Sequence, residues 1–91
     1  MTRRDTEPGE ELEQTVLRLL DARAKTATIC PSDAARAAYS GDDEGWRDLM
    51  DPVRDAVRRL AAAGQVEVVQ HGEPVDLDAA RGPVRIRRTG G

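Results

Sequence analysis

One stretch of the sequence decides the fold: DPVRDAVRRLAAAGQVEVVQ, residues 51–70. The apolar side chains of its first part recur with the i, i+3, i+4 spacing of an amphipathic helix, at Val53, Ala56, Val57 and Leu60. Asp51 is a suitable N-cap and Pro52 suits the first helical position, whereas Gly64 favours the end of a helix. The stretch therefore predicts a helix over residues 51–63 and a strand over residues 66–70.

The sequence before this stretch predicts two further helices. Apolar residues recur at helical spacing from Leu12 to Leu20, behind an acidic first turn, and indicate a helix over residues 8–24. Residues 27–30 are a short extended segment, and Ser32 is the expected N-cap of a helix over residues 32–39. Because Pro52 disfavours one continuous helix, residues 46–50 are expected to form a separate helical turn or a kinked preface.

The sequence after it predicts the second strand of a hairpin. Residues 84–88 alternate apolar and basic side chains and are the expected antiparallel partner of residues 66–70. In the 13-residue link between them, Asp76 is expected to cap one helical turn over residues 77–81. We expect a single domain over residues 8–88, with a flexible lead-in at 1–7 and a flexible C-terminus at 89–91.

This order of elements is that of an α+β winged helix. Such a domain has a three-helix core with a helix-turn-helix and a small antiparallel β-hairpin wing. With 2% aromatic residues, its core must be largely aliphatic. The expected core residues are Leu12, Val16, Leu19, Leu20, Ile29, Ala35, Trp46, Leu49, Val53, Val57, Leu60, Val66, Val68 and Ile86.

Several stretches together resemble a small bacterial family of winged-helix-like proteins of uncharacterised function. They are Leu60–Val66, Ile29-Cys30-Pro31-Ser32, Ala35-Arg36, Trp46-Arg47-Asp48-Leu49-Met50, Val53-Arg54, Gln70-His71-Gly72, Val75-Asp76 and Arg81-Gly82-Pro83-Val84-Arg85-Ile86-Arg87. The resemblance covers about residues 10–88 and implies the same fold. It supplies no catalytic or binding residues.

Composition excludes several classes of protein. The chain has 91 residues, a net charge of −3, one Cys and one His, which argues against a disulfide framework, a zinc site and a polybasic membrane tether. It has no apolar run of the roughly 20 residues that span a membrane. We therefore expect a cytoplasmic protein with no cofactor and no bound metal.

The leading hypothesis for function is a small regulatory-type module that binds double-stranded DNA. In this fold the third helix enters the major groove and the wing contacts phosphate or the minor groove. The side chains expected to do this are arginines of the third helix, of the turn before it and of the last strand: Arg47, Arg54, Arg58, Arg85, Arg87 and Arg88. The hypothesis requires these guanidinium groups to share one surface.

The alternative is a protein-interaction or homodimerisation module that does not bind nucleic acid. Acids are interleaved with the arginines, so Asp51 can pair with Arg54, Asp55 with Arg58 or Arg59, and Glu67 with Arg85 or Arg87. Arg36 is similarly expected to pair with an acid of residues 42–44.

Catalysis is not expected. Trp46 is expected to pack in the core or at a helix junction. Cys30 is expected to be a small buried side chain and His71 an exposed one in a turn, about 40 residues on in sequence. No nucleophile–base arrangement, phosphate-binding loop or metal-ligand spacing is present.

Overall fold

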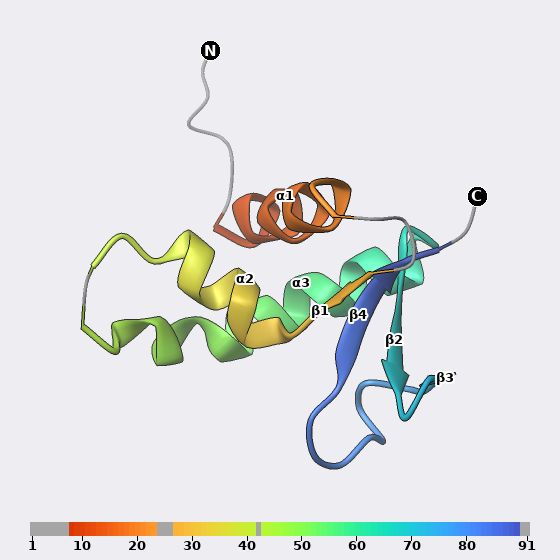
Figure 1. The fold of residues 1–91 in the computed structure, drawn as a ribbon. Helices are drawn as coiled ribbons and strands as arrows, with labels where there is room; N and C mark the ends of the chain where they lie inside the picture. Colours follow the sequence, from red (N-terminus) through yellow and green to blue (C-terminus); the bar gives the residue numbers. More distant parts are fainter. Residues whose placement is uncertain (1–7, 24–26, 42, 90–91) are drawn as a thin grey trace.

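The computed structural model describes residues 8–23, 27–41 and 43–89. Within these residues the chain forms three α-helices, a short 3-10 helix (η2) and four antiparallel strands, so the expected α+β class is confirmed (Figure 1). The elements are α1 (Pro8–Asp21), β1 (Thr28–Ile29), α2 (Pro31–Ala38), η2 (Gly45–Leu49), α3 (Met50–Ala62), β2 (Val66–Gln70), β3 (Glu73–Pro74) and β4 (Arg85–Arg88).

The sheet has the strand order β1-β4-β2-β3. The expected pairing of the last two long strands is confirmed, with Val68 opposite Ile86 and Glu67 opposite Arg87. On the other edge of β4, Ile29 of β1 faces Ile86, so the inner row of the sheet is apolar across three strands. The two-residue strand β3 was not predicted. The β2–β4 hairpin and its loop extend below the helices in Figure 1.

The end of α3 shows why the sequence turns from helix to strand at Gly64. The Gly64 N–H donates to the Ala61 carbonyl and the Gln65 N–H to the Leu60 carbonyl, both at 3.0 Å, which is a Schellman motif. Gly64 has a φ of +79°, a conformation that side-chain-bearing residues rarely adopt. The reversal at Gly64 directs the chain into β2, and Thr89 closes the corner by donating its hydroxyl to the Gly64 carbonyl at 2.7 Å.

Two predicted N-caps were wrong. The N-cap of α2 is Cys30 and not Ser32, because Pro31 occupies the first helical position and the Asp33 carboxylate accepts the Cys30 N–H at 2.9 Å. The N-cap of α3 is Leu49 and not Asp51. Pro52 still lies in the first turn, where backbone N–H groups have no helical partner, so it does not disturb the helix.

Other boundaries shifted by a few residues. α1 ends at Asp21 rather than near residue 24, which lies outside the described residues. The expected separate turn before α3 is confirmed as η2. Residues 1–7 and 90–91 also lie outside the described residues.

The core lies between the three helices and the inner face of the sheet. All but three of the predicted core residues are buried, and the exceptions, Leu19, Trp46 and Leu49, are partly buried against the core. Ala56, part of the predicted apolar stripe of α3, is also buried, and four apolar residues of the described chain are buried that were not predicted: Ala34, Val69, Leu77 and Val84. None of the described helices is long and apolar enough to cross a membrane.

Candidate functional site

The α3 arginines were expected to face a DNA groove, and Arg58 instead holds two carboxylates. Its Nε and Nη2 lie 2.7 Å from Asp78 Oδ1, and Nη1 donates to Asp55. The hydrogen bond to Asp78 is the main reason that the pKa of Arg58 is raised. The Asp55–Arg58 pair was expected from sequence, whereas Asp78 comes from the loop between β3 and β4. Arg58 therefore ties α3 to the β3–β4 loop.

The two neighbouring arginines of α3 differ from Arg58. Arg59 projects from α3 about 100° around the helix from Arg58. Its Nε is 2.5 Å from Glu13 of α1, so it fastens α1 to α3 instead of pairing with Asp55. Arg54 is half-buried, and no carboxylate of the described residues forms an ion pair with it. The expected Asp51–Arg54 pair is absent from the described part of the chain.

Arg47 belongs to a cluster around Trp46 in η2. Its Nε donates to Glu44 Oε1 at 3.0 Å, and its guanidinium lies 4.7 Å from the centre of the Trp46 ring. Arg36 of α2 also lies over this ring, at 4.4 Å, rather than beside Asp43 or Glu44. Its expected pairing with residue 42 falls outside the described residues. Trp46 thus joins η2 to α2, as the junction interpretation predicted.

The β4 arginines are each engaged by a different element. The Arg85 guanidinium donates to the Thr28 hydroxyl at 2.8 Å, to the Thr28 carbonyl at 3.2 Å and to the Cys30 thiol at 2.8 Å. Arg87 Nε donates to Glu67 Oε2 at 3.2 Å, which is the expected cross-strand pair. Arg88 Nε lies 3.4 Å from Asp21 at the end of α1.

The cations consequently do not form the shared acid-free surface that the DNA hypothesis requires. Of the six candidate residues, four have a carboxylate of the described residues within 4.0 Å: Arg47, Arg58, Arg87 and Arg88. These acids come from α1, α3, β2 and two loops. Such solvent-exposed pairs contribute little to stability, but the acid of each pair offsets positive charge that a polyanion would contact.

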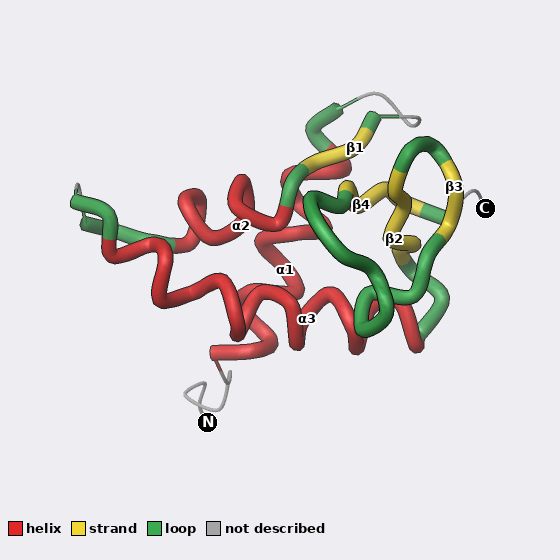
Figure 2. Tube along the Cα trace, turned by 90° about the horizontal axis from the view of Figure 1, so that it is seen from below, coloured by secondary structure: helices red, strands yellow, loops and turns green. Residues whose placement is uncertain are grey.

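The loop between β3 and β4 is part of this surface, and sequence reasoning described it only in part. The expected cap is present, because Asp76 Oδ1 accepts the Asp78 N–H at 3.0 Å, but it is followed by a turn over residues 77–79 and not by the expected helical turn over residues 77–81. Leu77 is 5% exposed and packs in the core, and Gln70 Nε2 donates to the Arg81 and Pro83 carbonyls at 2.5 and 3.1 Å. The loop consequently lies beside α3 (Figure 2). A leucine within a polar loop was the signal for this packing.

Cys30 and His71 lie on different elements. Cys30 was expected to be buried, but it is half-exposed and its thiol accepts from Arg85, whereas His71 lies exposed, as expected, in the turn after β2 with a φ of +55°. Within residues 8–23, 27–41 and 43–89, no cluster of three or more His, Cys, Asp or Glu side chains could hold a metal ion.

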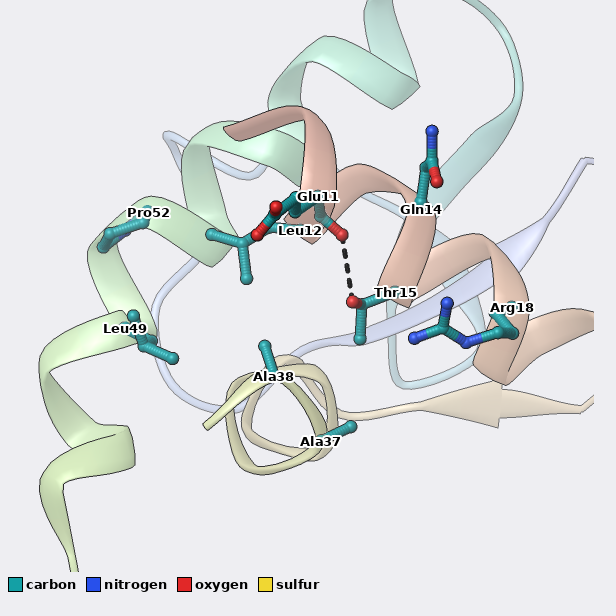
Figure 3. A pocket seen from close by; sticks show the side chains of 9 residues that line it. All are labelled: Glu11, Leu12, Gln14, Thr15, Arg18, Ala37, Ala38, Leu49 and Pro52. Atoms are coloured by element: carbon teal, nitrogen blue, oxygen red, sulfur yellow. Dashed lines mark hydrogen bonds between the residues drawn. The ribbon is translucent and has the colours of Figure 1, made fainter. Parts of the chain in front are cut away.

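A groove opens on the other side of the helices, between α1, α2 and the start of α3 (Figure 3). It has a volume of about 420 Å³. α1 contributes most of its lining, with smaller contributions from α2, η2 and α3: Glu11, Leu12, Gln14, Thr15, Arg18, Ala37, Ala38, Leu49 and Pro52. Thr15 is 5% exposed and donates its hydroxyl to the Glu11 carbonyl at 2.9 Å, so it leaves no unsatisfied hydroxyl in the groove.

Comparison with known proteins finds one family. A family model described as "Protein of unknown function (DUF3253)" matches residues 9–89, which include every described element but the first residue of α1. No curated protein matches the chain.

Proposed function

This chain belongs to the DUF3253 family, and we propose that it is a winged-helix domain whose partner is another protein. The proposal includes no catalysis, because the Cys30 thiol is engaged by Arg85 and His71 lies in a separate exposed turn. We place its action in the cytoplasm.

The winged-helix assignment is supported by the order of the elements and of the strands. A helix, a short strand, two helices and a hairpin follow one another, and β1 pairs with the last strand of that hairpin. In DNA-binding members of this fold, the third helix enters the major groove and the wing contacts the backbone. α3 and the β3–β4 loop are the corresponding elements here, so their surface charge distinguishes a DNA partner from a protein partner.

The observation that carries the proposal is the pairing of arginines with carboxylates on α3 and the wing. Arg58 is held by both Asp55 and Asp78, and the exposed Asp51 and Asp76 add further negative charge to these two elements. Duplex DNA carries about one negative charge per 1.7 Å of helix axis, so binding depends on a surplus of positive charge. A surface that carries charges of both signs is instead suited to a partner protein whose own charges complement it.

Titration with duplex DNA tests the proposal. We expect no saturable binding at about 50 mM salt, where contacts to phosphate are still strong. Binding that weakens steeply between about 50 and 200 mM salt would overturn it. Sedimentation of the purified chain over a range of concentrations, together with reconstitution from any purified partner, tests the positive half. A chain that stays monomeric and binds no protein contradicts the proposal.

DNA binding stays as the second candidate because two of the proposed contact residues have no acid partner in the described part of the chain. They are Arg54, on α3, and Arg85, whose hydrogen bonds go to neutral groups. Ion pairs at the surface are weak, so phosphates can compete for Arg47, Arg58, Arg87 and Arg88. If binding is observed, Arg54→Glu tests whether α3 contacts the DNA, because it reverses a charge on α3 without breaking an ion pair of the residues that the structure describes.

A further inference from the structure

The stretch of α1 that lines the groove carries charges of opposite sign at its two ends. Glu11 and Arg18 both line it and are both exposed, and they are two helical turns, about 10 Å, apart along α1. Neither side chain forms an ion pair with any residue that the structure describes. Within the part of the chain that the structure describes, their charges are therefore available to a partner.

The order of these residues along α1 is self-complementary. Glu11 lies three residues before Gln14, and Arg18 lies three residues after Thr15, so the centre of the pattern falls between Gln14 and Thr15. If a second α1 packs antiparallel with its two-fold axis at that centre, Glu11 of each copy faces Arg18 of the other. This reciprocal contact is the defining property of a two-fold symmetric interface.

The rest of the groove permits such an approach. Ala37 and Ala38 on the α2 side are exposed and small, so a neighbouring helix can come close without a steric clash. The Thr15 hydroxyl already donates to the Glu11 carbonyl, so covering it costs no hydrogen bond (Figure 3). At the centre, a Gln14 amide can both donate to and accept from a second Gln14.

We propose that the groove binds α1 of a second copy of this chain, in an antiparallel homodimer joined by two reciprocal Glu11–Arg18 ion pairs. The proposal rests on the function proposed above only in taking the partner to be a protein. One short helix per copy buries less than the roughly 800 Å² per partner of a standard interface, so the dimer is expected to be weak, in the micromolar range.

Charge reversal tests the reciprocal pairing. Glu11→Arg leaves two positive charges on the face and Arg18→Glu leaves two negative charges, so each variant alone is expected to lose dimer affinity by about tenfold or more. An equimolar mixture of the two variants restores both ion pairs and is expected to associate within a few-fold of the original affinity. The matched control is Glu73→Arg, a reversal of an exposed charge on β3, which is expected to leave association unchanged.

The measurement is sedimentation equilibrium of the full chain from about 5 µM to 1 mM, with circular dichroism to confirm that each variant is folded. Self-association that the single reversals weaken and the mixture restores is the expected result. A monomer throughout, a dimer indifferent to both reversals, or a mixture that stays monomeric would overturn the proposal.

These outcomes are distinguishable from failure of the proposed function. If the chain is monomeric and also binds no DNA, the dimer proposal is wrong, but a protein partner of another kind is still expected. If the chain dimerises through α1 and also binds DNA with a steep salt dependence, the dimer proposal is confirmed and the proposed function is wrong.

Discussion

Substitution of Gly64 measures how much the left-handed backbone conformation at the end of α3 costs a residue that carries a side chain. Replacing it with alanine keeps the backbone hydrogen bonds of Gly64 and Gln65 to Ala61 and Leu60. The added Cβ would meet no atom within 4 Å, so no steric contact contributes to the effect. What remains is the cost of holding an L-residue at a φ of +79°, which is about 1–2 kcal/mol.

The expected result of Gly64→Ala is therefore a loss of about 1–2 kcal/mol of unfolding free energy. With an m-value of about 1 kcal/mol/M, the urea midpoint falls by about 1–2 M. Gly64→Asn should cost less, because asparagine tolerates the left-handed region better than alanine does.

A chemically synthesised chain with D-alanine at position 64 is the matched control. It adds the same methyl group, but a positive φ suits a D-residue, so stability should be equal to or above that of the glycine protein. Equal urea midpoints for the L-alanine and glycine proteins would refute the backbone account of this helix end.

Three further predictions concern the loop, the cap and the turn before η2. Leu77→Ala should lower the free energy of unfolding by about 2–3 kcal/mol, at the lower end for a buried leucine. It should also raise amide hydrogen exchange in residues 76–83 more than in α1. A uniform rise in exchange would show that Leu77 does not anchor the loop. Asp33→Ala should cost about 1 kcal/mol by thermal unfolding because it removes the carboxylate that accepts the Cys30 N–H, and an unchanged melting temperature would contradict that role. The Tyr39 hydroxyl, which donates to Asp43, holds the pKa of Asp43 below its usual value, so the contact stabilises the fold at neutral pH and is lost as the pH falls through that lowered pKa. In Tyr39→Phe the pKa of Asp43, followed by NMR, should therefore rise toward its ordinary value, and no change would exclude the hydroxyl as its cause.

The ion pairs show which contacts of the candidate site could be predicted from the sequence and which could not. Asp55–Arg58 and Glu67–Arg87 were within reach of sequence reasoning, because one is set by helix spacing and the other by strand register. Arg58–Asp78, Arg59–Glu13 and Arg88–Asp21 were not, because each joins residues from elements distant in sequence. Whether six arginines form one cationic surface depends on these long-range pairs.

The sequence by itself determined most of the elements of this protein, with the exception of β3. Helical spacing, a helix-ending glycine and β-branched residues are local signals, and they located α1, α3, β2 and β4 and most of the aliphatic core. The prediction of Ser32 as the N-cap of α2 was wrong because Ser32 and Cys30 both neighbour Pro31. The hydrogen bond from the Cys30 N–H to the Asp33 carboxylate shows that Cys30 is the N-cap.

Only the tertiary structure decided what the surface presents. Burial of Leu77 brings the β3–β4 loop beside α3 and gives Arg58 a second carboxylate, while the packing of α2 on α1 leaves a groove between Glu11 and Arg18. The physical reason is that element formation depends on neighbouring residues, whereas the charge and shape of a surface depend on which distant side chains packing brings together.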